Sequence, residues 1–162
     1  IRSCLVGSEM CIRDRNVLNS VNQVESVKRV VLTSSIAGIY DSMKDVEDTP
    51  EGKFTEEVWN TRSTLEGNPY SLSKVMAERA AWEIADAQSR WDMTVVNPAL
   101  VIGPAVGNSS TSESFVTLTQ MGDGTMKSGV PALSLPAVDV RDLAEAHFAA
   151  GFTPEALSLI HI

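Results

Sequence analysis

Tyr70 and Lys74, in the stretch PYSLSK, stand four positions apart, which places both side chains on one face if the stretch is helical. An ammonium group one turn from a phenol favours the ionised phenolate, and such a tyrosine can exchange a proton with a substrate oxygen. The same spacing recurs at Tyr40 and Lys44, so spacing alone does not identify a site. The elements around each pair must distinguish them.

The Tyr70 pair falls in the strongest predicted helix, which covers residues 69–89. Pro69 suits the first helical position, and Asn68 before it suits the capping position. In this helix Tyr70 and Lys74 would lie on the same face, and we therefore predict that this pair is catalytic.

The Tyr40 pair falls in the polar segment 36–68, which is expected to form a long surface loop. Acidic neighbours should neutralise Lys44 there instead of leaving it to act on Tyr40. These neighbours are Asp41, Asp45 and Glu47.

Three hydroxyl residues follow a short apolar run at 30–32, which is typical of a strand buried on both faces of a parallel sheet. They are Thr33, Ser34 and Ser35. Ligands of open α/β sheets bind at the carboxyl ends of strands, so a hydroxyl here could polarise a carbonyl group. Ordinary capping of the strand end explains the same residues equally well.

The remaining pattern alternates strands with helices, which predicts an α/β fold with a parallel sheet. Further helices are expected at 16–26, 111–121 and 140–151, with Gly151 as the stop of the last one, and further strands at 92–98 and 134–140. No glycine-rich turn follows a strand, so the first βαβ units of a dinucleotide-binding fold have no counterpart.

Composition excludes several classes of function. A net charge of −8 is unfavourable for binding nucleic acid or anionic membranes, and no apolar run is long enough for a membrane span. We expect a cytoplasmic protein with no metal site. His147 is interpreted as a packing or hydrogen-bonding residue, because no partner base or nucleophile accompanies it.

Both ends look foreign to the protein. One codon choice for residues 9–14 is the reverse complement of one choice for 157–162, shifted by two bases, as in a sequencing-library adapter. We therefore predict that 1–15 and 157–162 are non-native, and that 16–156 is the later half of a dinucleotide-binding domain with the start of a substrate lobe. Cys4 and Cys11 then lie outside the native part.

Four motifs occur in one order: VKRVVLTSSIAGIY, NPYSLSKVMAERAAWE, TVVNPALVIGP and VDVRDLAEAH. Together they resemble the extended short-chain dehydrogenase/reductase family, in its dihydroflavonol-reductase and methylglyoxal-reductase branch. The likeness covers nearly all of residues 16–151. It implies a partial Rossmann-like, doubly wound parallel sheet.

The resemblance also implies roles for individual residues. Tyr70 would be the general acid/base and would also contact the cofactor, Lys74 would tune it and bind the nicotinamide ribose, and Ser35 would bind the substrate carbonyl. The cofactor side would be lined by Thr33 and Ser34 and by the run Pro98, Ala99, Leu100 and Val101.

The family further implies reduction of an aldehyde or ketone with NADPH or NADH, NADPH being favoured by the branch. Two alternatives stay open: a sugar-nucleotide epimerase or dehydratase, and a non-catalytic NAD(P)-binding protein. A homodimer would form through helices 16–26 and 69–89. Without the phosphate-binding half, the chain alone is expected to bind cofactor poorly and to be inactive. Substrate and stereochemistry are not predicted.

Overall fold

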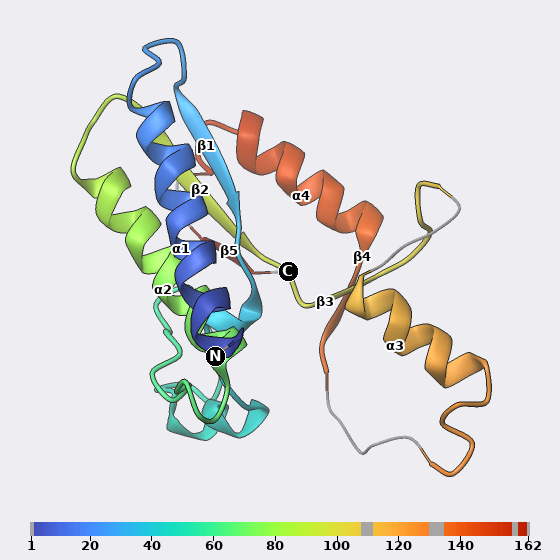
Figure 1. Cartoon of the computed structure of the whole chain (residues 1–162). Coiled ribbons are helices and arrows are strands. Elements are labelled where there is room, and N and C mark those ends of the chain that lie inside the picture. Colours follow the sequence, from blue (N-terminus) through green and yellow to red (C-terminus); the bar gives the residue numbers. More distant parts are fainter. Residues whose placement is uncertain (1, 108–111, 130–134, 157–158, 162) are drawn as a thin grey trace.

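The computed structural model describes residues 2–107, 112–129, 135–156 and 159–161. Its helices are α1 (Arg2–Val21), α2 (Pro69–Asp86), α3 (Glu113–Gly122) and α4 (Val140–Phe152), with the short 3-10 helices η1 (Ile36–Gly38) and η2 (Met43–Asp48). Its strands are β1 (Arg29–Thr33), β2 (Asp92–Asn97), β3 (Leu100–Ile102), β4 (Ala137–Asp139) and β5 (Leu159–His161). Helices α1 and α2 lie side by side on one face of the sheet, and α4 crosses the other face (Figure 1).

The strands pair in parallel, which confirms the predicted α/β class. One sheet has the order β1-β2-β5, and Val30 of β1 stands opposite Met93 of β2. The strand predicted at 134–140 is confirmed as β4, but it pairs with β3 in a separate two-stranded sheet. This second unit, with α3 against β3, stands apart from the main sheet (Figure 1).

The prediction that β1 is buried on both faces is wrong. Its residues are half-buried and Thr33 is exposed, whereas Met93 to Asn97 of β2 are all buried. The reason is position in the sheet: β1 is an edge strand with one neighbour, while β2 lies between β1 and β5.

The main core lies between the sheet and the α1–α2 pair. Its buried members are Leu18, Ala81, Ala85, Trp91, Met93 and Val95. Alanines on α2 let the two helices approach closely, because they add no bulk at the contact.

The helix predicted at 16–26 ends earlier, at Val21. Arg90 holds the turn that follows, donating to the carbonyl oxygens of Val21 at 2.8 Å and Val24 at 2.6 Å. Helix α1 includes residues 2–15, and β5 lies in the other segment predicted to be non-native.

Helix α4 runs through Gly151 to Phe152, so the prediction that Gly151 stops the helix is wrong. A Cβ at Gly151 would stand 3.8 Å from Val31 Cγ2, an ordinary contact distance, so this residue packs against β1. The start of α4 agrees with expectation, because the Asp139 carboxylate accepts a hydrogen bond from the backbone N–H of Arg141 at 2.8 Å.

Arg29 fastens the C-terminal end of α4 to β1. Its guanidinium donates to the carbonyl oxygens of Ala150 at 3.3 Å and Pro154 at 3.0 Å, and also to that of Thr153. Carbonyls at a helix end have no partner within the helix, and a cation also favours the negative end of the helix dipole.

We therefore expect Arg29→Ala to lower the free energy of unfolding by about 1–2 kcal/mol, because three charge-assisted bonds are lost at a partly exposed site. Urea denaturation followed by circular dichroism measures this. Lys28→Ala, at the exposed neighbouring position, should cost less than about 0.5 kcal/mol. Equal losses for the two variants would contradict the role assigned to Arg29.

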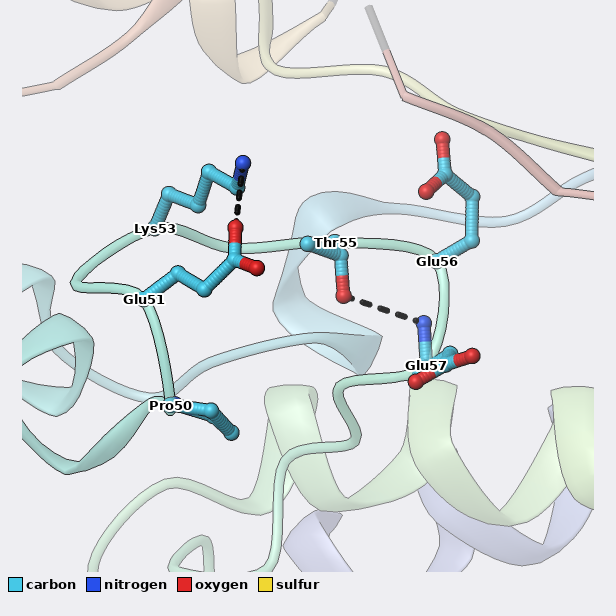
Figure 2. Close-up of a pocket in the computed structure, with 6 residues that line it drawn as sticks. All are labelled: Pro50, Glu51, Lys53, Thr55, Glu56 and Glu57. Carbon is cyan, nitrogen blue, oxygen red and sulfur yellow. Dashed lines mark hydrogen bonds and ion pairs between the residues drawn. The ribbon is translucent and has the colours of Figure 1, made fainter.

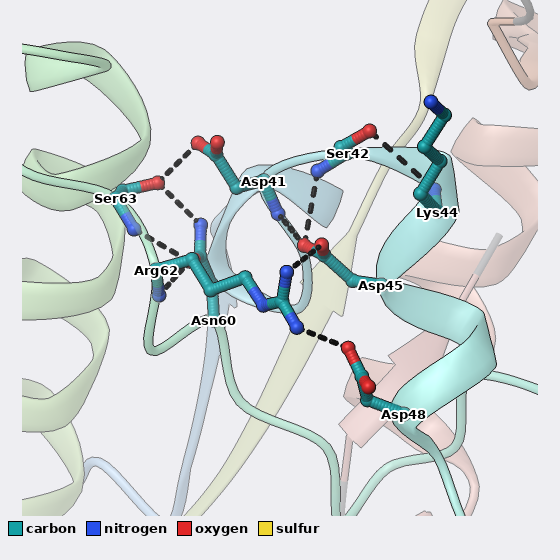
Figure 3. Close-up of polar contacts among 8 residues, drawn as sticks. All are labelled: Asp41, Ser42, Lys44, Asp45, Asp48, Asn60, Arg62 and Ser63. Carbon is teal, nitrogen blue, oxygen red and sulfur yellow. Dashed lines mark hydrogen bonds and ion pairs between the residues drawn. The ribbon is translucent and has the colours of Figure 1, made fainter.

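The segment 36–68 is more ordered than the surface loop predicted. Figure 3 shows a polar network in which Asn60 Nδ2 donates to Ser63 Oγ at 2.7 Å, and Arg62 pairs with Asp45 and Asp48. Asp45 also accepts from the backbone N–H of Ser42, at 3.0 Å, in a capping box at the start of η2.

The expected neutralisation of Lys44 is not observed. Among the described ion pairs none includes Lys44, because Asp45 pairs with Arg62, and Asp41 accepts from Ser63 at 2.5 Å and Asn68 at 2.9 Å. Tyr40 stacks on Phe54 with ring centroids 4.4 Å apart, and burial raises the pKa of its phenol. The Tyr40 pair is thus part of a structured loop.

Among the described residues, no helix is both long and apolar enough to cross a membrane.

Candidate functional site

The Tyr70–Lys74 pair has the geometry predicted for it. The Asn68 side chain accepts from the backbone N–H of Ser71 at 3.1 Å, and Pro69 is the first residue of α2. Lys74 Nζ lies 5.8 Å from the centroid of the Tyr70 ring. Tyr70 is 51 % exposed, so its phenol is open to a ligand. Because the Asn68 cap starts α2 at Pro69, Tyr70 and Lys74 both lie within the helix and one turn apart.

Ser35 lies where β1 leaves the sheet. The backbone N–H of Ser34 donates to the Val96 carbonyl at 2.9 Å, and that of Ile36 donates to the Pro98 carbonyl at 3.1 Å. Ser35 Oγ then caps η1 by accepting from the Ala37 N–H at 3.2 Å. Capping uses the oxygen only as an acceptor, and the hydroxyl hydrogen stays free to be donated to a carbonyl oxygen. Capping and carbonyl binding are therefore compatible readings of Ser35.

A cavity of about 570 Å³ brings most of the predicted site residues together. Those that line it are Ser34, Ser35, Tyr70, Pro98, Ala99, Leu100 and Val101. Seven of the nine predicted residues thus line the same cavity, although they come from the end of β1, the start of α2 and the segment after β2.

Thr33 and Lys74 do not line the cavity. The Thr33 hydroxyl donates to His147 Nε2 at 2.7 Å, with the tautomer assigned so that His147 Nδ1–H donates to the Leu143 carbonyl at 2.8 Å. This confirms the hydrogen-bonding role predicted for His147. Lys74 instead lies over the Tyr70 ring.

The cavity also has lining residues that sequence reasoning missed. They are Ile36, Ala37, Asn68, Ser71, Glu113, Ser114, Leu135 and Pro136. Glu113 and Ser114 begin α3, and Pro136 precedes β4 and accepts from the Leu100 N–H at 3.1 Å. Only the pairing of β3 with β4 brings these segments to the site, and no local pattern indicates that pairing.

Acidic side chains surround Lys74 from two helices. Asp14 of α1 lies close enough for Lys74 to lower its pKa, although the larger effect is burial, which raises it. Glu78, one turn further along α2, is buried. Asp14 belongs to the segment predicted to be non-native, so this contact depends on that segment.

Gly103 forms the turn after β3 with a φ of +125°, a backbone conformation that residues other than glycine rarely adopt. A Cβ there would also stand 2.9 Å from Val140 Cγ1, at the start of α4. The turn behind the cavity wall thus depends on glycine for two reasons.

We expect Gly103→Ala to lower the free energy of unfolding by about 2–3 kcal/mol, from backbone strain together with the clash. Gly107→Ala is the matched control, because Gly107 has a φ of +115° but nothing within 4 Å of its added Cβ. It should cost only about 1 kcal/mol. Chemical denaturation of both variants measures the difference, and equal costs would exclude the clash.

Two other features near the surface do not form part of this site. Trp59 stacks under Arg79, whose guanidinium carbon lies 5.1 Å from the ring centroid, so Trp59 anchors its loop and does not line the cavity. A second hollow, along residues 50–57, contains a Lys53–Glu51 ion pair of 2.5 Å and no predicted site residue (Figure 2).

The comparisons with known proteins agree with the motifs. A model of the NAD dependent epimerase/dehydratase family matches residues 11–158. NADPH-dependent methylglyoxal reductase GRE2 of Saccharomyces cerevisiae is 33% identical over 150 residues, which is 84% of this chain and 43% of that protein. Cinnamoyl-CoA reductase CAD2 of Medicago truncatula is 37% identical over 138 residues, 83% of this chain and 40% of that protein.

A solved structure gives the same result in three dimensions. Yeast methylglyoxal/isovaleraldehyde reductase Gre2, complexed with NADPH, superposes with a TM-score of 0.63 at 32% identity, covering 85% of this chain and 43% of that one. The chain therefore spans less than half the length of these relatives, and it has the partial Rossmann-like fold predicted. It belongs to the NAD dependent epimerase/dehydratase family.

Proposed function

We propose that this chain is the catalytic half of an NAD(P)-dependent reductase that converts an aldehyde or ketone to an alcohol. The observation that supports it most is that Ser35 and Tyr70 line one cavity while Lys74 lies over the Tyr70 ring. A carbonyl oxygen held between two hydroxyls can be polarised by one and protonated by the other.

The residues fit the nicotinamide end of the cofactor. The segment Pro98–Val101 gives the cavity an open wall beside Tyr70, and half-exposed Lys74 can reach a ribose hydroxyl. Bound NADPH or NADH would supply hydride to the carbonyl carbon. The described residues include no glycine-rich turn after a strand, so the pyrophosphate has no cradle in them, and we propose that the chain alone is inactive.

The protein then performs positioning and proton transfer. Ser35 donates its hydroxyl hydrogen to the carbonyl oxygen and orients it, while Tyr70 gives that oxygen a proton as negative charge develops there. Lys74 stabilises the resulting phenolate through its positive charge. We favour NADPH, because the yeast relative GRE2 is described as NADPH-dependent and the solved Gre2 structure is a complex with NADPH.

The decisive experiment uses the full-length protein, obtained from the source DNA. NADPH and NADH oxidation are followed against a panel of small aldehydes and ketones. Turnover supports the reductase. Tight cofactor binding without turnover would favour the epimerase or the non-catalytic protein instead, and η1 offers no acidic side chain for a dehydratase. Absence of cofactor binding would contradict all three.

Three further proposals accompany this function. A homodimer would form through α1 and α2, where Val17 and Met76 are exposed, and analytical ultracentrifugation of the full-length protein tests it.

Residues 1–15 and 157–162 would be non-native, and sequencing of the source locus tests that. A cytoplasmic location would suit NADPH chemistry, and cell fractionation tests it.

A further inference from the structure

Glu78 is a buried acid that the mechanism above does not use. It lies on α2 one turn beyond Lys74 and two turns beyond Tyr70, and it is only 2 % exposed. Its Oε2 lies 3.1 Å from the point where a Cβ on Gly38 would stand. The turn η1 can therefore close over this carboxyl because Gly38 has no side chain. A carboxyl so removed from water is unfavourable unless its neighbours satisfy it or it keeps its proton.

Several buried polar side chains surround this carboxyl. Burial raises the pKa of Glu78, and Ser34, Asn97, Trp82 and the charge of Lys74 lie close enough to oppose the rise. Nevertheless, within the described part of the chain, Glu78 Oε2, Trp82 Nε1 and both amide atoms of Asn97 have no partner at normal hydrogen-bond geometry. Groups of this kind are seldom left unpaired in native proteins, so small shifts or a buried water must satisfy them.

The cluster adjoins the wall of the cavity, which its member Ser34 helps to line. Ser34 precedes Ser35, and Asn97 is the last residue of β2 before Pro98. Both Ser35 and Pro98 line the cavity. Through Glu78 the cluster thus joins the end of β1, the end of β2 and helix α2, which hold the predicted catalytic and cofactor-binding groups.

Burial favours a protonated carboxyl, and the surrounding donors and acceptors can satisfy one. An ionised Glu78 could only accept, from the Ser34 hydroxyl, the Asn97 amide and the Trp82 indole. A neutral Glu78 donates one hydrogen and still accepts from Trp82 or from the Asn97 amide. Lys74 is the charged group whose field reaches Glu78; the neighbours presented by β1 and β2 are uncharged.

We propose that Glu78 is a positioning residue of the Ser35–Tyr70–Lys74 site, acting as a neutral acid that ties the Ser35 turn and the end of β2 to helix α2. The inference deepens the proposed function and rests on it for its catalytic consequence. Its structural consequence, the placement of Tyr70, can be tested in the chain itself.

The first test observes Tyr70 by NMR in chains labelled with 13C tyrosine. The chain has 2 tyrosines, and Tyr70→Phe assigns the signals. Glu78→Gln should leave the Tyr70 ring signals in place, because an amide also donates and accepts. Glu78→Met fills similar space without hydrogen bonds and should move them, with the circular dichroism spectrum unchanged. Glu83, on the same helix with its side chain 70% exposed, is the control, and Glu83→Met should move nothing.

A titration keeps the test decisive if Glu78→Met fails to fold. In the wild-type chain the Tyr70 signals should show a step, above the ordinary pH range of a glutamate, that Glu78→Gln lacks. The comparison is made with Asp14→Asn in both chains, because Asp14 faces Lys74 and its pKa is raised too. No such step, or Tyr70 signals that move equally in Glu78→Gln and Glu78→Met, would overturn the proposal.

The second test uses the full-length enzyme. Glu78→Met should lower kcat at least about tenfold with KM for the carbonyl substrate changed by less than about threefold, and Glu78→Gln should restore most of kcat. A Glu78→Met enzyme with normal kcat overturns the proposal. If the wild-type enzyme turns over no carbonyl, the proposed function fails, and the NMR result still decides whether Glu78 positions Tyr70.

Discussion

Tyr70→Phe should lower kcat/KM of the full-length protein for carbonyl reduction by about 10²–10⁴-fold, which corresponds to about 3–5 kcal/mol of transition-state stabilisation. The variant loses only a hydroxyl. The Tyr70 ring is half-exposed and lies beside the Lys74 ammonium group. Without that hydroxyl the site loses the proposed proton donor that shares the cavity with Ser35. Steady-state kinetics with NADPH measures the effect.

The chain offers a matched control for this prediction. Tyr40 has the same spacing to Lys44, but it stacks on Phe54 and lies outside the cavity lining. Tyr40→Phe should therefore leave kcat/KM within about threefold of wild type. Comparable losses in the two variants would show that Tyr70 is not the acid.

Trp91→Ala should lower the free energy of unfolding by about 3–5 kcal/mol, because it empties the largest side chain of the main core. Trp91 is 3% exposed, packs with Leu18 and Met93, and donates its indole N–H to Asn22 Oδ1 at 2.8 Å. A domain of this size is stable by only about 5–15 kcal/mol, so a large share of its stability would be lost. Urea denaturation followed by circular dichroism measures the loss.

Trp91→Phe separates packing from hydrogen bonding. It keeps an aromatic ring in the core but removes the donor to Asn22, whose exposed carbonyl oxygen can bind water instead. The expected cost is about 1–2 kcal/mol. A loss as large as that of Trp91→Ala would mean that the hydrogen bond, and not the filled volume, holds the turn after α1 in place.

Local chemistry accounts for what was predicted correctly. The helix of Tyr70 begins at Pro69 because Asn68 caps it, and both signals stand next to each other in the chain. The strand β2 follows from its own apolar run. The features predicted wrongly depend on distant partners. Gly151 looks like a helix stop until β1 is seen to pack against it.

The acidic residues near Lys44 show the same limit. Proximity in sequence suggested that they neutralise Lys44, but in the fold Asp45 pairs with Arg62 and Asp41 accepts from Ser63. These partners lie further along the chain, and the turns of the segment 36–68 bring them back. A short-range rule cannot choose between a neighbouring cation and a better-placed distant one.

The sequence by itself determined the α/β class, the helix of Tyr70 and Lys74, and the hydroxyls after β1, because each depends on periodicity, capping or composition within a few residues. Only the tertiary structure decided that the start of α3 and the segment before β4 join Ser35, Tyr70 and the segment after β2 in one cavity. It alone also shows Glu78 enclosed by η1 and β2. Burial and cavity walls arise where segments far apart in sequence pack together, and that packing is a property of the whole fold.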